Sequence, residues 1–230
     1  MYLCVTCSDE RANTGSLKYD GVMTLKLYEF GLSGNCHKVR LMLSMLGIQY
    51  ESHVVNGSAG EHKSADFLAL NPFGQVPVLL DEQVALRDSQ AILLYLALKH
   101  PAAKFYPTII EEQCAVQSWL SIASSEVTRG PGLLRLHYRF GKTIDVASAQ
   151  QTTLQLLQVL NATLATQSWL VGSSITIADL AIYPYLALAH EGQVDLTDYP
   201  AITNWLAAVE ALPGFVTMPG IQLHHHKVTQ

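Results

Sequence analysis

Residues 60–96 read GEHKSADFLALNPFGQVPVLLDEQVALRDSQAILLYL, and this stretch decides the fold. Its apolar spacing predicts a helix, two strands and a second helix, over residues 65–70, 76–80, 84–86 and 89–99. Pro77 belongs at the entrance of its strand, because proline has no amide hydrogen to donate within a sheet.

The sequence before this stretch adds a strand, a helix and another strand. Residues 25–30 alternate apolar and polar side chains, which predicts a strand. Apolar residues then recur at helical spacing over 39–46, and Gly47 ends that helix. Residues 48–55 predict the next strand. The combined order up to residue 99 is β-α-β-α-β-β-α.

The sequence after residue 107 is helical in pattern, and no strand candidate of comparable quality follows. Four helices are predicted, over residues 111–129, 146–166, 177–189 and 202–212. The chain therefore predicts an α/β domain followed by an all-α domain. The predicted segments are an N-terminal extension at 1–22, an α/β domain at 23–100, a linker at 101–110, an all-helical domain at 111–220 and a tail at 221–230.

The composition favours a folded chain with an apolar pocket or interface. Of the 230 residues, 49% are hydrophobic and only 14% charged, which excludes global disorder. A net charge of −5 argues against a nucleic-acid-binding surface, which needs a basic stripe. No stretch reaches the roughly 18 uninterrupted apolar residues of a membrane helix. We therefore expect a cytoplasmic protein without nucleic-acid or membrane partners.

The first 22 residues differ from the rest, and Met23 is a candidate start of the functional chain. Cys4 and Cys7 form a C-x-x-C pair there. No second pair follows at zinc spacing, and the pair does not lie at a strand-to-helix junction, so a plain tail is the favoured interpretation. The nine histidines likewise lack ligand spacing. We expect no bound metal.

Two short loops carry candidate binding chemistry. Ser33 precedes the helix at 39–46, where unpaired amides and the helix dipole stabilise an anion by about 0.3–1 kcal/mol. Its hydroxyl could stabilise a ligand thiolate, although a plain helix N-cap is the commoner role for serine there. Asp88 and Ser89 precede the next helix, where a serine hydroxyl could bind a carboxylate and Asp88 an ammonium group. An N-cap is again the alternative.

The segment around Pro77 offers a third signal. A cis peptide bond at a strand entrance would leave the backbone of Val76 facing outward. Its amide and carbonyl could then pair with an extended peptide ligand, as an added strand does. Few X-Pro bonds are cis, so the spacing of these residues is weak evidence for a cis bond at Pro77.

Together these signals, in this order on this pattern, resemble the cytosolic glutathione transferase family, and most closely its serine-type, phi- and theta-like branch with many bacterial members. Residues 60–96 carry most of the resemblance. Residues 174–179 (SITIAD) are similar to the capping box of the family's core helix, with Thr176 as cap and Asp179 reaching back. The resemblance covers about residues 24–213, and it implies a thioredoxin-like N-terminal domain and a symmetric homodimer.

The resemblance also implies roles for individual residues. Ser33 occupies the position of the hydroxyl that binds the glutathione sulfur and lowers its pKa. The implied glutathione-binding residues are His62 and Lys63 at the glycine carboxylate, Gln75, Val76 and cis Pro77 along the peptide, and Asp88 and Ser89 at the γ-glutamyl end. The co-substrate is then a small apolar electrophile, attacked by the thiolate. Trp119, Arg129, His137 and Tyr138 lie in the helical region that would form its pocket.

Cys36 leaves a second reaction open. It follows Ser33 by about one helical turn, where a cysteine could have a lowered pKa and form a mixed disulfide with glutathione. Glutathione-dependent reduction of disulfides or peroxides is therefore the enzymatic alternative. A non-catalytic binding protein of the same fold is the other alternative, and the intact set of glutathione-binding residues counts against it.

Overall fold

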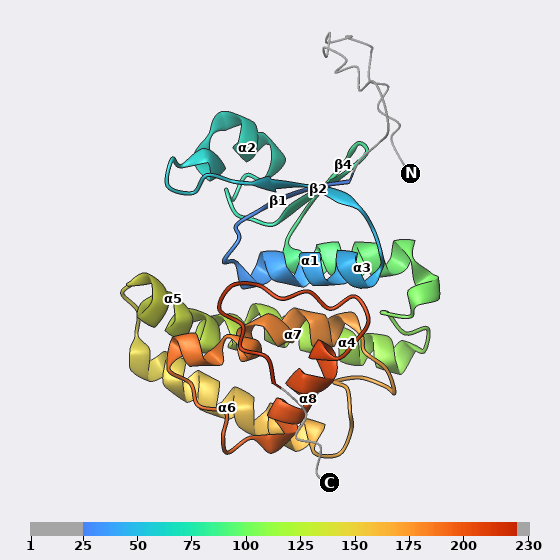
Figure 1. The fold of residues 1–230 in the computed structure, drawn as a ribbon, viewed down its shortest axis with the longest axis vertical. Helices are drawn as coiled ribbons and strands as arrows, with labels where there is room; N and C mark the ends of the chain where they lie inside the picture. Colours follow the sequence, from blue (N-terminus) through green and yellow to red (C-terminus); the bar gives the residue numbers. More distant parts are fainter. Residues whose placement is uncertain (1–24, 225–230) are drawn as a thin grey trace, which may run out of the picture.

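The computed structural model describes residues 25–224, so the N-terminal extension with Cys4 and Cys7, and most of the C-terminal tail, lie outside it. The first unit has the predicted order β-α-β-α-β-β-α (Figure 1). Its elements are β1 (Leu25–Glu29), α1 (Gly34–Met45), β2 (Tyr50–Val54), α2 (Ala65–Leu70), β3 (Val78–Asp81), β4 (Val84–Arg87) and α3 (Ser89–Lys99). The α/β prediction for this half is confirmed.

The four strands form one mixed sheet in the order β2-β1-β3-β4. β1 pairs in parallel with β2 and antiparallel with β3, and β3 pairs antiparallel with β4. Helices α1 and α3 cover the face of the sheet that looks toward the second domain, whereas α2 lies on the opposite side (Figure 1). Val55, Phe67 and Val78 form the small core beneath α2.

The second domain is all-helical, as predicted. Its helices are α4 (Ile110–Ser124), α5 (Leu133–Phe140), α6 (Val146–Leu164), α7 (Ile177–Ala187) and α8 (Pro200–Glu210). α4 is shorter than predicted, and a π-helical turn, η3 (Thr128–Gly132), connects it to α5. The sequence pattern predicted neither η3 nor α5. Gly130, Pro131 and Gly132 read as helix breakers in the sequence. Here they are buried, and a Cβ on Gly130 would come within 2.9 Å of Thr153 Oγ1. Packing against α6 therefore favours the π-helical conformation of this segment.

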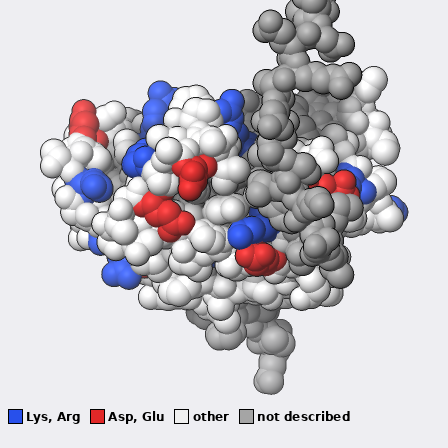
Figure 2. Space-filling view, turned by 90° about the horizontal axis from the view of Figure 1, so that it is seen from above, with Lys and Arg blue, Asp and Glu red and all other residues white. Residues whose placement is uncertain are grey.

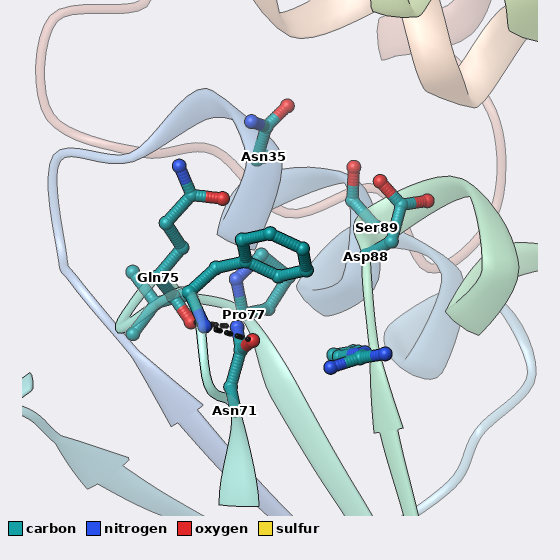
Figure 3. A pocket seen from close by; sticks show the side chains of 9 residues that line it. Asn35, Asn71, Gln75, Pro77, Asp88 and Ser89 are labelled. Atoms are coloured by element: carbon teal, nitrogen blue, oxygen red, sulfur yellow. Dashed lines mark hydrogen bonds between the residues drawn. The ribbon is translucent and has the colours of Figure 1, made fainter. Parts of the chain in front are cut away.

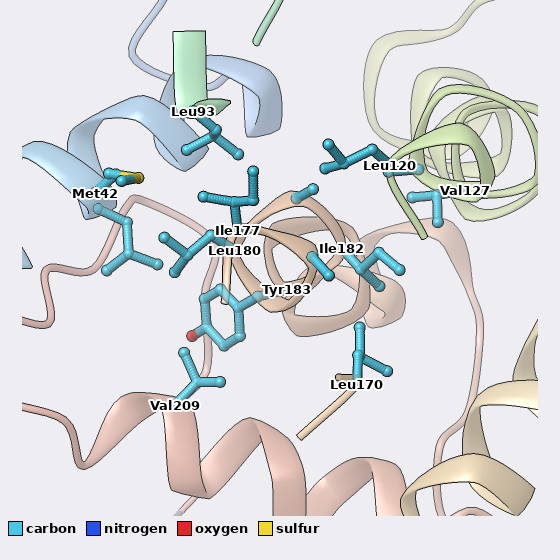
Figure 4. Close-up of a cluster of buried hydrophobic side chains, with 14 of the residues drawn as sticks. Met42, Leu93, Leu120, Val127, Leu170, Ile177, Leu180, Ile182, Tyr183 and Val209 are labelled. Atoms are coloured by element: carbon cyan, nitrogen blue, oxygen red, sulfur yellow. The ribbon is translucent and has the colours of Figure 1, made fainter. Parts of the chain in front are cut away.

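One hydrophobic core joins the two domains. α7 crosses its centre, and Figure 4 shows its Leu180 and Tyr183 among side chains from both domains, including Met42 of α1 and Leu93 of α3. Burying a large apolar side chain contributes about 1.5–3 kcal/mol, so this shared core stabilises the contact between the domains.

The N-terminus of α7 carries the predicted capping box. The Thr176 hydroxyl accepts a hydrogen bond from Ala178 N at 3.2 Å, and Thr176 N donates to Asp179 Oδ2 at 2.9 Å. Asp179 is fully buried and also accepts from Leu170 N at 3.0 Å and from Trp205 Nε1 at 2.9 Å. The aspartate thus connects the start of α7 to the preceding loop and to α8.

The surface reflects the low content of charged residues. On the face in Figure 2, single acidic and basic groups alternate within larger uncharged areas. No helix within residues 25–224 has the length and apolar content needed to cross a membrane.

Candidate functional site

Ser33 ends the loop that leads from β1 into α1. Its backbone is extended, with φ −83° and ψ 121°, and its hydroxyl accepts a hydrogen bond from Cys36 N at 3.3 Å. Ser33 is therefore the N-cap of α1. The same residue is half-buried and lines a cavity, so its hydroxyl hydrogen remains to be donated to a ligand. The cap and the ligand-binding interpretations hold together through different atoms.

Cys36 does not have the reactive environment that its spacing allowed. The thiol is fully buried, and Phe30 N donates a hydrogen bond to its Sγ at 3.4 Å. Burial raises the pKa of the Cys36 thiol to about 11, although the contacts with Ser33 and Phe30 oppose that rise. The expectation of a lowered pKa is wrong, because the thiol is buried against the start of the loop that precedes α1 and is removed from solvent.

A cavity of about 250 Å³ gathers most of the predicted glutathione-binding residues (Figure 3). Figure 3 shows Gln75 on one side and Asp88 with Ser89 on the other. We call this site the cradle. Its lining residues are Asn35, Asn71, Phe73, Gln75, Val76, Pro77, Arg87, Asp88 and Ser89.

The loop before β3 shapes one wall of the cradle. The Val76–Pro77 peptide bond is cis, as the family resemblance implied. Asn71 is buried, and its side chain donates to Gln75 O at 2.7 Å and accepts from Phe73 N at 3.1 Å. Sequence reasoning assigned no role to Asn71, although its place directly before a Pro-Phe-Gly turn is a signal for such a loop-closing side chain.

Asp88, and not Ser89, caps α3. Its Oδ1 accepts hydrogen bonds from Gln90 N at 3.0 Å and from Ala91 N at 3.1 Å, and its φ of 71° places it in the left-handed region. Ser89 is buried and donates to Gln90 Oε1 at 2.7 Å. Asp88 is exposed at the cradle, so a carboxylate oxygen faces ligand space beside the helix N-terminus.

His62 and Lys63 are not among the residues that line the cradle, so their contact with the glycine carboxylate stays a prediction. Lys63 Nζ donates to Phe73 O at 3.1 Å and to Gly74 O at 3.0 Å, so it braces the loop that carries Gln75. The His62 ring packs edge-on against Phe30, with centroids 5.6 Å apart. Lys63 thus supports the loop before β3, and His62 packs against the residue that follows β1.

A larger cavity of about 810 Å³ lies between the domains, beside the cradle's helix α1. We call it the interdomain cavity. Ser33 is part of its wall, so the α1 N-terminus faces this space. Its lining is mainly apolar and comes from both domains: Phe30, Leu32, Ser33, Gly34, Gly57, Ser58, Thr128, Gly132, Arg135, Leu136, Phe140, Lys142 and Tyr185.

The residues predicted for a second-substrate pocket lie elsewhere. Arg129 is exposed and pairs with Glu126 at 3.5 Å, His137 Nδ1 contacts Lys142 O at 2.8 Å, and Trp119 packs against the main core. Tyr138 is also absent from the cavity lining. From this part of the chain, Thr128 and Gly132 of η3 and Arg135, Leu136 and Phe140 of α5 line the cavity instead. The sequence pattern did not predict α5, so it could not show which of its side chains face the cavity.

Two buried side chains of α1, Lys38 and His37, and the partly buried Tyr185 of the interdomain cavity have strongly shifted pKa values. Burial lowers the pKa of the Lys38 ammonium to about 7, against the opposing effects of Asp88 and Cys36. Its Nζ lies 5.4 Å from the centroid of the Tyr185 ring. Burial also lowers the pKa of His37 to about 3 and raises that of Tyr185 to about 12. His37 and Tyr185 are therefore uncharged near neutral pH, whereas Lys38 loses its charge as the pH rises through about 7.

Comparisons with known proteins agree with this geometry. Residues 32–99 match the model of the glutathione S-transferase N-terminal domain, and residues 109–213 match that of the glutathione S-transferase C-terminal domain. Glutathione S-transferase 3 of Zea mays is 33% identical over 83% of this chain and 91% of its own length. The disulfide-bond oxidoreductase YfcG of Escherichia coli is 31% identical over 80% of this chain and 89% of its own. The crystal structure of a glutathione S-transferase from Xanthobacter autotrophicus Py2 superposes with a TM-score of 0.79 at 34% identity, covering 86% of this chain and 98% of that one.

None of the sites contains a recognisable metal centre. Within residues 25–224 no group of three or more His, Cys, Asp or Glu side chains is placed to hold a metal ion.

Proposed function

This chain belongs to the glutathione S-transferase family, and on that premise we propose that it binds glutathione in the cradle and activates its thiol at Ser33. The thiolate attacks a small apolar electrophile held in the interdomain cavity. A carbon–sulfur bond forms, the leaving group departs with its electron pair, and the thiol proton passes to solvent.

The position of Ser33 carries this proposal. Its hydroxyl lies at the N-terminus of α1 and in the wall of the interdomain cavity, so a thiolate beside it meets a donor, the helix dipole and a bound electrophile together. Lowering a thiol pKa from about 9 to about 6.5 requires about 3.4 kcal/mol of preferential thiolate stabilisation. A hydroxyl and a helix end can supply that much in a partly dry site such as this one.

The cradle supports the orientation of glutathione. Asp88 offers a carboxylate to the γ-glutamyl ammonium group, and the α3 N-terminus beside Ser89 suits the adjacent carboxylate. Val76 lies just before β3, where an extended tripeptide can align with the strand.

The decisive test is the pH dependence of the ultraviolet thiolate absorbance of bound glutathione. We expect an apparent thiol pKa well below 8 in the unmodified protein and a return toward about 9 in Ser33→Ala, with kcat/KM at neutral pH reduced about 100-fold. Ser58→Ala is the matched control, because Ser58 lines the same cavity while its hydroxyl is bonded to Asn56 at 2.8 Å. An unchanged pKa in Ser33→Ala would move the chemistry to another donor, and absence of glutathione binding would overturn the proposal.

Glutathione-dependent disulfide reduction is the second candidate, and the likeness to YfcG favours it. In that reaction two glutathione molecules are oxidised to their disulfide while one substrate disulfide is reduced to two thiols. The buried Cys36 is badly placed to take part, so the thiolate beside Ser33 would be the nucleophile here too. We expect disulfide reduction to survive in Cys36→Ser and to fall in Ser33→Ala. The reverse pattern would restore Cys36 as the reactive group.

The proposal includes a symmetric homodimer. Phe73 is 66% exposed at the rim of the cradle, with the Arg87 guanidinium 5.3 Å from its ring centroid, and such an exposed aromatic suits a subunit contact. Light scattering on the purified protein tests the dimer. A mass of one chain at micromolar concentration would exclude it.

A further inference from the structure

Arg135 is a buried cation with one unused hydrogen-bond donor in the wall of the interdomain cavity. Its side chain is only 6% exposed. Nε donates to Glu191 Oε2 at 2.6 Å, and Nη1 donates to Leu32 O at 2.9 Å. Nη2 is buried and has no partner within the described part of the chain. An unsatisfied charged donor is costly to bury, and this one belongs to a residue that faces ligand space.

The charges around Arg135 leave an excess of positive charge. Glu191 also pairs with Arg139, at 3.3 Å, so one carboxylate serves two guanidinium groups. Lys142 is the second cationic side chain that lines the cavity, whereas the lining residues include no aspartate or glutamate. The charged side chains in the wall of this mainly apolar cavity are thus all cationic.

The unused donor lies close to the reacting centre. Arg135 is bonded to the carbonyl of Leu32, the residue directly before Ser33. The Phe140 ring covers the guanidinium, with its centroid 5.2 Å from Cζ, and Phe140 is itself 41% exposed at the cavity. Because Nη2 is itself buried, a ligand oxygen can reach it only if a covering group such as this ring moves.

We infer that the second substrate is an amphipathic anion: an apolar electrophile whose carboxylate is bound by Nη2 of Arg135. This inference rests on the proposed function and narrows its substrate class. The apolar walls hold the body of the molecule, and the guanidinium offsets the repulsion between its carboxylate and the glutathione thiolate. A charge-assisted hydrogen bond in such a dry site is stronger than a neutral one.

A matched pair of small ligands tests the anion site without any reaction. Phenylbutyrate and phenylbutyramide share an apolar body and differ in the charge of the end group, and calorimetry gives their dissociation constants for the full chain. We expect the carboxylate to bind at least about tenfold more tightly. Equal binding, or tighter binding of the amide, would overturn the inference.

Two variants then separate Arg135 from its surroundings. Arg135→Gln should abolish the preference for phenylbutyrate, whereas Arg139→Gln should keep it, because Arg139 shares Glu191 but does not line the cavity. A preference that survives in Arg135→Gln would contradict the role of this residue. If Arg135→Gln does not fold, the binding comparison in the unmodified chain still decides the charge preference.

Conjugation connects the site to the proposed function. A para-chlorodinitrobenzoate and its methyl ester present the same carbon to the thiolate, and chloride leaves from both. The ratio of kcat/KM for the acid to kcat/KM for the ester does not depend on the fraction of active enzyme in a preparation. We expect this ratio to fall about tenfold to a hundredfold in Arg135→Gln, because the carboxylate loses its donor, and to stay within about twofold in Arg139→Gln. Equal losses for both substrates would mean that Arg135 only supports the loop. Selective phenylbutyrate binding without any conjugation would keep the anion site and reject the transferase proposal.

Discussion

The cradle and the interdomain cavity are built in different ways. The cradle is formed by residues of one domain, most of them within residues 71–89, and its walls are held by local caps and turns. The interdomain cavity depends on contacts such as Arg135 to Leu32, which spans 103 positions in the chain. A site made of local motifs can be read from a sequence, whereas a site made by docking two domains depends on how helices pack.

The largest effect should come from Asp179, which organises the helix behind the interdomain cavity. Asp179→Ala leaves the amides of Leu170 and Thr176 and the indole of Trp205 buried without their acceptor. We expect the free energy of unfolding to fall by about 3–5 kcal/mol in denaturant titrations. Asp145→Ala, at the exposed cap of α6, should cost about 1 kcal/mol. Similar losses in both variants would contradict the special role of the α7 cap.

Lys38, at the boundary between the two sites, should make stability depend on pH. The pKa of Lys38 is about 7 in the folded protein, whereas the ordinary value is 10.5. Between pH 7 and pH 10.5 the unfolded chain therefore binds more protons than the folded one, so the free energy of unfolding rises with pH. Below pH 7 the folded protein carries a buried charge. Lys38→Met should therefore raise the free energy of unfolding by about 1–4 kcal/mol at mildly acidic pH, and by less toward pH 10.

Thermal or denaturant unfolding across that pH range checks the Lys38 prediction, with the exposed Lys142→Met as control. A difference between Lys38→Met and the unmodified chain that does not change with pH would show that the amine titrates normally.

A smaller effect is expected from removing one charge in the cradle. Asp88→Asn keeps a cap acceptor, and asparagine tolerates the positive φ of this position. We expect the dissociation constant for glutathione to rise about tenfold while the KM for a neutral electrophile stays unchanged. Asp145→Asn supplies the control at a distant cap. A change in the electrophile KM alone would show that the two sites are not separable in this way.

The smallest effects distinguish the predicted lining of the second pocket from the observed one. Leu136→Ala, in the cavity wall, should raise the KM for a neutral apolar electrophile about fivefold, because apolar contact area is lost. Arg129→Ala should change that KM by less than about twofold, since its side chain is 66% exposed and points away from the lining. Steady-state kinetics measures both KM values. A larger rise in KM for Arg129→Ala than for Leu136→Ala would show that the electrophile binds at the residues predicted from the sequence.

The sequence by itself determined the α/β half, the cradle and the capping box of α7. Alternating strands, the Pro77 strand entrance and the pairing of Thr176 with Asp179 depend on neighbours a few positions away, so spacing reveals them. Gln75, Val76, Pro77, Asp88 and Ser89, which the family resemblance selects, line one cavity. The sequence pattern left open which residue caps α3, since the positive φ of Asp88 is not visible in it.

Only the tertiary structure decided the second site and the state of the buried groups. η3, with Gly130 and Pro131 buried, leads into α5, and Arg135 of α5 lines the cavity whereas Arg129 does not. The core around α1 buries Cys36 and raises its pKa, although its position beside a helix N-terminus alone suggests the opposite. The burial of a side chain, and the face that a helix turns toward a cavity, both depend on which residues pack against it. Those residues are distant in the sequence, so local patterns do not reveal them.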